Sequence, residues 1–250
     1  VVDDSEGGRP RRDRTPDTGC IPTPSMEFDE LLRTRRSVHQ YSDEAIDADT
    51  LESIFEAATL APSGYNLQPW EFLVLREDDG KAALREVAYD QAHVTEADTA
   101  VVVLGHTDPM RHAESVFEDW LAKEYIPSEE VRDTLLENVA GMAELPESER
   151  RVWTTRSTAL AAMTLMYAAW DRGVASCPME GFDPEALAEA FEIPGEYEPV
   201  MLVTLGYPAE DASDVENERK GRRPIEEVVH YGSFEPGDAT TLSVPAPDDD

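Results

Sequence analysis

This sequence has little cysteine, little lysine and no long apolar run. Its two cysteines, Cys20 and Cys177, are too few for a disulfide framework and lack the CxxC spacing of a zinc site. The longest apolar stretch, residues 159–170, is interrupted by Thr164 and is shorter than the roughly 18 residues that indicate a membrane span. Residues 1–25 contain no apolar signal-peptide segment. We therefore expect a cytoplasmic protein that does not cross a membrane.

Positive charge is also scarce. The chain has 54 Asp and Glu against 21 Lys and Arg, a net charge of -33, and only Lys81, Lys123 and Lys220 are lysines. This charge argues against nucleic acid or an anionic membrane as partner, because both repel an acidic surface. Spread-out carboxylates with few lysines are typical of halophilic proteins, in which high salt screens the self-repulsion. An acidic protein without that adaptation is the alternative.

The chain is expected to form one domain with a tail at each end. Residues 1–25 lack apolar periodicity, so we expect a disordered tail, or a non-native extension ahead of a natural start at Met26. Residues 26–232 hold the regular patterns, and residues 233–250 form an acidic C-terminal tail. Hydrophobic content of 40% over 250 residues is enough for one full core or two small ones.

Hydrophobic periodicity predicts helices and strands in alternation. Phe28, Leu31 and Leu32 form one face of a short helix, and Asp49 or Thr50 is expected to cap the next. Helices are predicted over residues 51–60, 81–89, 114–125, 128–142, 154–172 and 184–191, and strands over 72–75, 100–104 and 199–205. This mixture predicts an α+β fold.

Two basic clusters stand out against the acidic background. Residues 33–37 (RTRRS) and 219–223 (RKGRR) together hold seven of the 21 basic residues. Like charges packed so closely repel one another unless an anion lies among them. If the fold brings the two clusters together, they form a cage for a phosphate group.

Common nucleotide and metal motifs are absent from the sequence. It has no GxGxxG, no GxxxxGK[ST] and no HExxH. His106, Asp108 and His112 are candidate metal ligands, but their spacing fits no common site. We predict no metal site.

Four segments in a fixed order resemble a known family. They are RRSVHQY at residues 35–41, APSGYNLQPW at 61–70, PMEGFD at 178–183 and KGRRP at 220–224. Together they are similar to the FMN-dependent nitroreductase family, over about residues 26–232. The resemblance implies a nitroreductase-like α+β fold with a mostly antiparallel sheet, and a domain-swapped homodimer that holds two FMN molecules at its interface. The FMN-binding positions it implies are Arg35, Arg36, Ser37, His39, Pro62, Ser63, Asn66, Gln91, Pro178, Glu180, Gly181, Lys220 and Arg222.

The resemblance gives these positions different roles. Arg35, Ser37, Lys220 and Arg222 would hold the phosphate, since arginine binds phosphate through strong charge-assisted hydrogen bonds. Arg33 and Arg36 could instead pair with nearby carboxylates. Ser63 and Asn66 would approach the flavin from the partner subunit, with Pro62 fixing the turn. A helix stop followed by a strand entry is the structural alternative for that segment.

Other positions would face the reacting ring. Gln91 would reach the pyrimidine edge of the flavin, although a solvated helix end is an alternative. The segment from Pro178 to Gly181 would lie over the flavin N5, where a backbone N–H tunes the ring, with Glu180 and Gly181 as the leading candidates. We expect Cys177 to be a small buried residue rather than a redox thiol.

His39 departs from the family pattern. The family usually has Arg or Lys there, facing the N1–O2 edge of the flavin. Histidine carries a positive charge only under more acidic conditions. The strength with which this chain stabilises the reduced flavin is therefore an open question, and a plain hydrogen bond to a backbone carbonyl is the alternative role.

The resemblance also implies an activity. A hydride would pass from NADH or NADPH to FMN and then to a nitroaromatic or quinone acceptor, in two half-reactions. Residues 106–152 would roof the pocket, with Trp120, Tyr125 and Trp153 as substrate contacts. The same fold hosts reductive dehalogenation and flavin metabolism, and a non-catalytic flavin-binding protein is a third alternative.

Overall fold

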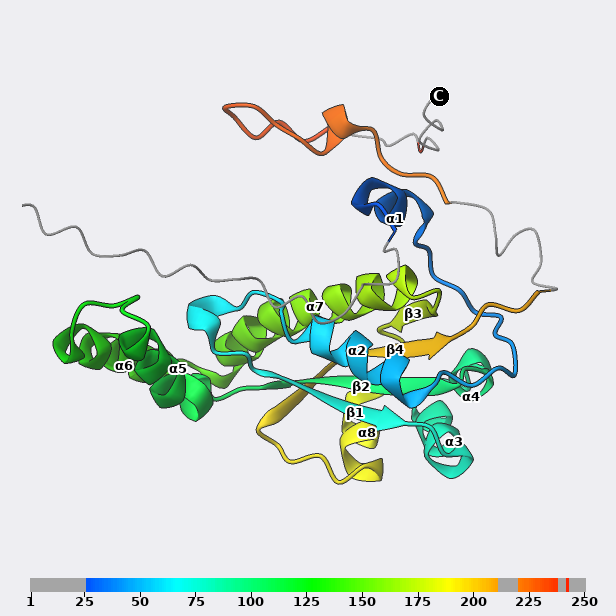
Figure 1. The fold of residues 1–250 in the computed structure, drawn as a ribbon, viewed down its shortest axis with the longest axis horizontal. Helices are drawn as coiled ribbons and strands as arrows, with labels where there is room; N and C mark the ends of the chain where they lie inside the picture. The colour runs from blue at the N-terminus through cyan, green and yellow to red at the C-terminus, as the bar shows by residue number, and fades with distance from the viewer. Residues whose placement is uncertain (1–25, 211–219, 238–241, 243–250) are drawn as a thin grey trace, which may run out of the picture.

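The fold is built on one antiparallel sheet, described by a computed structural model of residues 26–210, 220–237 and 242. Its strands are β1 (Trp70–Leu75), β2 (Thr99–His106), β3 (Ala175–Met179) and β4 (Tyr197–Gly206), in the order β1-β2-β4-β3. Each neighbouring pair is antiparallel. The α+β class and the antiparallel sheet expected from the sequence are confirmed (Figure 1).

Helices cover both faces of the sheet. On one face pack α2 (Ala48–Ala58) and the long α7 (Glu147–Asp171), and on the other α3 (Asp78–Val87), α4 (His93–Glu96) and α8 (Pro184–Ala190) (Figure 1). Strand β2 shows why both faces are apolar. Val101 and Val103 join the α2–α7 core, whereas Ala100 and Val102 join the α3–α8 core. Successive strand residues face opposite sides, so a continuous apolar run fits a strand covered on both faces.

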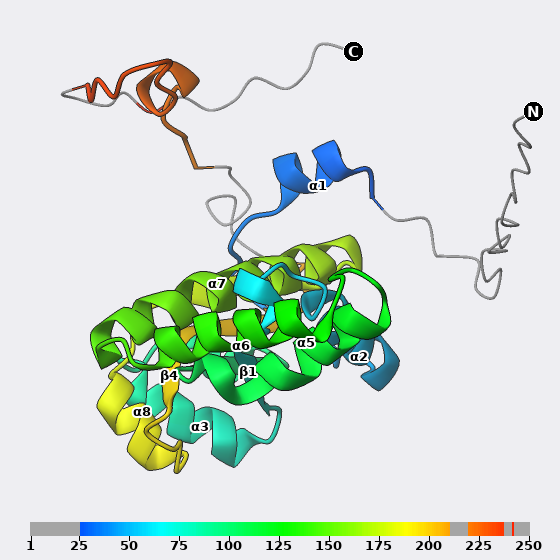
Figure 2. The same ribbon diagram turned by 90° about the vertical axis from the view of Figure 1, so that its left-hand side faces the viewer.

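Two helices form a separate pair beside α7. They are α5 (Ala113–Ala122) and α6 (Glu129–Ala143), preceded by the short helix η2 (Pro109–His112) (Figure 2). Their small core contains Phe117, Val139 and Leu67, and Leu67 follows the short helix η1 (Gly64–Asn66). This core therefore ties the α5–α6 pair to the segment that leads into β1. None of the helices in the described ranges is long and apolar enough to span a membrane.

Several element boundaries differ from those predicted. Helix α7 begins at Glu147, earlier than expected, because its first turns are polar and leave no apolar periodicity. The cap of α2 is Asp47, whose side chain accepts a hydrogen bond of 2.9 Å from the Thr50 N–H, so the predicted caps Asp49 and Thr50 were wrong. Buried Ile46 anchors the chain directly before that cap.

Two short elements and one apolar face were misjudged. Strand β3 was not predicted, and it contains Pro178, which an edge strand tolerates. Helix α4 has only four residues and was also missed. In α1 (Phe28–Thr34) only Leu31 is buried, whereas Phe28 and Leu32 are exposed. Phe28 meets Tyr167 of α7 edge-on, with ring centroids 6.4 Å apart, so the predicted apolar face is partly covered.

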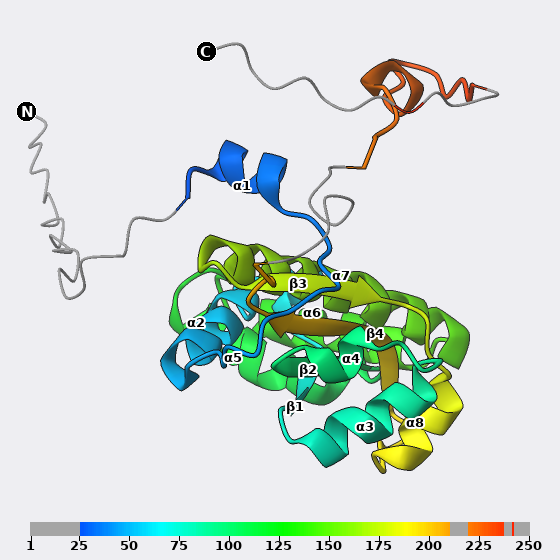
Figure 3. The same ribbon diagram turned by 90° about the vertical axis from the view of Figure 1, so that its right-hand side faces the viewer.

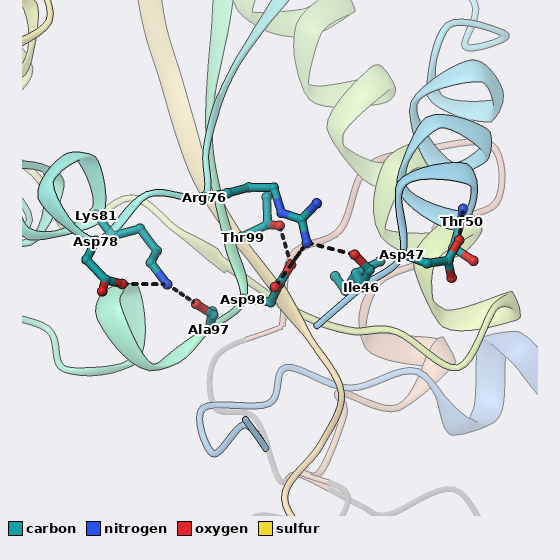
Figure 4. A network of polar contacts seen from close by, with 9 residues as sticks. All are labelled: Ile46, Asp47, Thr50, Arg76, Asp78, Lys81, Ala97, Asp98 and Thr99. Atoms are coloured by element: carbon teal, nitrogen blue, oxygen red, sulfur yellow. Dashed lines mark hydrogen bonds and ion pairs between the residues drawn. The ribbon is translucent and has the colours of Figure 1, made fainter. Parts of the chain in front are cut away.

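A polar network joins the ends of several elements (Figure 4). Arg76, just after β1, donates to the Ile46 carbonyl at 2.7 Å and forms an ion pair with Asp98 at 3.0 Å. The buried Lys81 donates to the Ala97 carbonyl at 2.9 Å. These bonds satisfy two cations at the sheet end and fix α3 and the start of α2 against β2.

Gly105 leaves no room for a side chain between β2 and α7. A Cβ there would lie 2.5 Å from Thr154 Oγ1 and 2.8 Å from Thr158 Oγ1. Gly105→Ala is therefore expected to lower the free energy of unfolding by about 1–3 kcal/mol, the usual cost of overpacking. Urea denaturation measures it.

Gly141 in α6 offers the matched control, because a Cβ there meets nothing within 4 Å. Gly141→Ala should raise stability by about 0.5–1 kcal/mol, since alanine favours the helix interior. Equal effects of the two substitutions would contradict the packing argument.

The segment at residues 220–237 lies apart from the sheet and its helices (Figures 2 and 3). It contains the short helix η3 (Ile225–Glu227) and exposes large apolar side chains, among them Tyr231 at 90% and Phe234 at 77%.

Candidate functional site

The first basic cluster lies against β3. Ser37 forms a parallel bridge with Ser176, and the Val38 N–H donates to the Ser176 carbonyl at 3.1 Å. Val38 is buried, whereas Ser37 is half-buried and His39 is exposed. Because side chains alternate along extended chain, Ser37 and His39 face the side away from Val38. Figure 3 shows this segment running beside β3 toward α4.

Three elements meet at His39. Its ring lies edge-on to the His93 ring, with centroids 5.1 Å apart. His93 belongs to α4, and its Nε2 lies 3.1 Å from the Met179 Sδ at the end of β3. The residues predicted at 35–39 and at 178–181 are therefore brought together. His93 was missed by the sequence analysis, because its short helix shows no periodic pattern.

Gln91 holds Gly181 in place. The Gln91 side-chain N–H₂ donates to the Gly181 carbonyl at 2.8 Å and to the Ala88 carbonyl at 2.9 Å. Tyr89 and Asp90 adopt φ values of 53° and 56°, the left-handed region, to turn the chain toward it. A Cβ on Gly181 would lie 3.2 Å from Gln91 Nε2. Glycine therefore makes room for the Gln91 side chain beside this backbone, and Gln91 orients it.

The second motif forms an unusual turn at the start of β1. Ser63 Oγ accepts a hydrogen bond of 2.9 Å from the Gln68 N–H. Tyr65, Asn66 and Gln68 have φ values of 53°, 57° and 46°. Non-glycine residues in this region cost about 1–3 kcal/mol each, and such strain clusters at functional sites. Exposed Asn66 thus sits on a turn held by buried Leu67.

The two halves of the predicted site lie at opposite edges of the sheet. β1, which follows the 62–66 turn, is one edge strand, and β3, which leads into Pro178–Gly181, is the other. Three strand spacings separate them, about 14 Å. In Figure 1 the turn after α2 lies toward α5 and α6, and β3 lies toward α4.

The described residues of the two basic clusters lie in separate parts of the chain. Arg36 stacks over the Trp170 ring at 5.4 Å. Lys220 and Arg222 belong to the segment that lies apart from residues 35–39 (Figures 2 and 3). Both are exposed, and Arg222 donates to the Lys220 carbonyl at 2.9 Å. The phosphate cage predicted from the sequence therefore needs another copy of the chain or a movement of this segment.

The three aromatic candidates for substrate contact line two different cavities. Trp120 and Tyr125 border one of about 490 Å³ at the tip of α5. Trp153 borders another of about 280 Å³, together with Pro62, Ser63 and Gly64. The aromatic residues predicted to contact one substrate thus border separate cavities in the single chain. Cys177 is buried in the sheet core, as expected.

The fold as a whole is shared with solved structures. The chain belongs to the nitroreductase family, whose family model matches residues 32–207. It is 36% identical over 178 residues to "Putative NAD(P)H nitroreductase YodC" of Bacillus subtilis (strain 168), covering 71% of this chain and 87% of that protein. It is 33% identical over 207 residues to "NADH dehydrogenase" of Thermus thermophilus, covering 82% and 96%.

A solved structure gives the same result. It is a nitroreductase in complex with FMN from Exiguobacterium sibiricum 255-15, with a TM-score of 0.73 and 29% identity. The match covers 84% of this chain and 100% of that one.

Proposed function

We propose that two copies of this chain bind two FMN molecules at their interface and transfer hydride from NADH or NADPH to a nitroaromatic or quinone acceptor. The observation that carries this proposal is the packing of residues 35–39 beside the Met179–Gly181 turn, with Gly181 kept free of a side chain. The FMN complex of a relative with the same fold supports it.

The residues present fit FMN. A phosphate needs cations and hydrogen-bond donors, and Arg35 and Ser37 are half-buried beside β3. A planar ring needs close access to backbone, and Gly181 adds no side chain that could stand against it. FMN, when bound, accepts a hydride at N5 and passes it to the acceptor.

The chain's own residues would bind and orient. Arg35 and Ser37 would hold the phosphate from one side, and Lys220 and Arg222 from the other. Gln91 would keep the Glu180–Gly181 backbone in position for a hydrogen bond at N5. Because that backbone is fixed before the cofactor arrives, little reorganisation is needed during the reaction.

The partner copy would complete the site. Ser63 and Asn66 lie at the sheet edge opposite to Gly181, so they would reach the flavin of the other subunit. The exposed apolar side chains of residues 220–237 supply a surface for that contact. In a twofold dimer each such contact is made twice, which gives two equal sites.

The acidic surface is proposed as an adaptation to high salt in a cytoplasmic enzyme. A net charge of -33 disfavours association of two like-charged subunits unless salt screens their repulsion. The scarcity of lysine supports this reading.

Mixed dimers test the shared site. Gly181→Val and Asn66→Trp should each abolish FMN binding in their own homodimers, since each disrupts one half of every site. When the two variants are mixed and allowed to exchange subunits, about one quarter of all sites should recover FMN, because each heterodimer has one intact site. Bound FMN and NAD(P)H oxidation with a quinone measure the recovery.

Two results would contradict the proposal. No recovery in the mixture would show that one chain carries the whole site. Wild-type protein that binds FMN but oxidises neither NADH nor NADPH would be a flavin-binding protein without this activity.

His39 is proposed to influence the flavin potential. Reduction adds negative charge to the flavin, so a nearby cation favours reduction. By linkage, the cation stabilises the reduced flavin by the same free energy by which the reduced flavin stabilises the cation. His39→Arg is expected to raise the midpoint potential at pH 8.

His39→Gln provides the neutral control. Its midpoint potential should lie below that of His39→Arg, because glutamine carries no positive charge. Potentiometric titration of the three proteins measures both effects, and superimposable curves would assign His39 a structural role beside His93.

A further inference from the structure

One arginine on α7 has no partner among the residues that the structure describes. In residues 26–210, 220–237 and 242, every Lys and Arg except Arg156 makes a hydrogen bond, an ion pair or a ring contact. Arg156 is exposed. Carboxylates outnumber cations 54 to 21 in this chain, so an arginine left without one is an informative exception.

Arg156 lies at a small cavity between α7 and the turn before β1. The cavity has a volume of about 280 Å³, and Ser63, Gly64, Trp153 and Leu160 also line it. Trp153 Nε1 is buried without a hydrogen-bond partner. It lies 3.4 Å from the position of a Cβ on Gly64. A buried donor without an acceptor costs about 1–3 kcal/mol, which an incoming oxygen would recover.

These groups suit one class of ligand. An indole and a leucine favour a flat apolar ring, and an arginine with an N–H donor favours an oxyanion. The volume is at the small end of the range of about 300–1,000 Å³ for ligand pockets, enough for a single ring and too small for a dinucleotide. In a chain of charge -33 the general field repels anions, so local recognition needs an uncompensated cation.

We propose that this cavity is a subsite for aromatic acceptors that carry a carboxylate, with Arg156 as the specificity-determining residue. The proposal rests on the proposed function, because Ser63 belongs to the turn that would reach the partner's flavin. The ring would lie against Trp153, and the carboxylate would accept from the Arg156 guanidinium. The cavity thus selects which acceptors reach the flavin.

Binding of benzoate and benzamide to the FMN-loaded dimer tests the subsite without turnover. Both are flat rings of similar size, and only benzoate has a carboxylate. Wild type should bind benzoate more tightly, as followed by tryptophan fluorescence at constant ionic strength. Arg156→Gln should weaken benzoate binding roughly tenfold or more, the effect of one charged hydrogen bond, and leave benzamide unchanged. Arg156→Lys should keep part of the preference.

Arg151→Gln is the matched control, since it removes the same charge from the same helix. Arg151 is paired with Glu147 at 2.8 Å and with Glu198, so benzoate binding should not change. With nitro acceptors, Arg156→Gln should raise the KM for 4-nitrobenzoate and not that for 4-nitrobenzamide.

Three outcomes would overturn the proposal. They are equal binding of benzoate and benzamide by wild type, dissociation of the dimer by Arg156→Gln in sedimentation, and a KM increase for NADPH in place of the nitrobenzoate effect. The first removes the carboxylate site, the second places Arg156 in the subunit interface, and the third assigns the cation to a dinucleotide phosphate. If wild type bound FMN but NADH did not reduce it, the proposed function would be refuted. Benzoate binding is measured by fluorescence without turnover, so it tests the subsite separately.

Discussion

Arg222→Ala is expected to weaken FMN binding by about 1.5–3 kcal/mol, the range for a hydrogen bond to a charged group. The Arg222 guanidinium is exposed and, within the described residues, donates only to the Lys220 and Gly221 carbonyls. Both bonds lie within its own segment, so the side chain is available to a phosphate. Fluorescence titration of the apoprotein with FMN measures the change, which corresponds to about 10- to 150-fold in Kd.

Its neighbour Arg223 is the matched control. Arg223 donates to the Glu227 carbonyl at 3.0 Å and pairs with the Glu227 carboxylate at 3.7 Å. It is therefore occupied inside the segment, and Arg223→Ala should change FMN affinity little. An equal loss in both variants would indicate a general effect of positive charge, and no loss in Arg222→Ala would remove Arg222 from the phosphate site.

Phe117→Ala is expected to lower the free energy of unfolding by about 3–5 kcal/mol, the usual cost of deleting a buried phenyl ring. Phe117 is fully buried in the small core of α5 and α6. Its ring meets Tyr65 at 6.2 Å and Trp120 at 5.2 Å between centroids. The cavity left behind would therefore loosen the α5–α6 pair and the turn that carries Asn66. Thermal and urea denaturation measure the loss.

Phe117→Leu tests whether the loss comes from the deleted volume. It keeps an apolar side chain of similar size, so it should cost less than about 1.5 kcal/mol. The alanine variant should also retain FMN less firmly than the leucine variant, because Tyr65 loses its packing. If Phe117→Ala lowered the free energy of unfolding by less than about 1 kcal/mol, α5 and α6 would have collapsed into the cavity left by the ring. That result would also show that they hold the turn at Asn66 only weakly.

The sequence by itself determined the fold class and the family, whereas the cofactor-site positions it implies stay predictions. A continuous apolar run such as that of β2 predicts a strand with both faces buried, whichever helices pack against it. Motifs such as PMEGFD at residues 178–183 can be recognised from the sequence alone. A glycine that adds no side chain has its effect at its own position, and that effect does not depend on distant residues. The same local character explains the errors. Polar turns of α7 and the short α4 carry no periodic signal, and a cap such as Asp47 depends on where Ile46 is anchored.

Only the tertiary structure decided which residues meet. Gln91 and Gly181 are far apart in sequence and share a hydrogen bond of 2.8 Å, so Gln91 orients Gly181, and its contact with the flavin stays a prediction. The structure also placed the two halves of the site at opposite edges of the sheet, and left Arg156 as the described cation without a partner. Pairing of this kind depends on strand order and helix packing, which arise from long-range contacts that no local pattern of residues records.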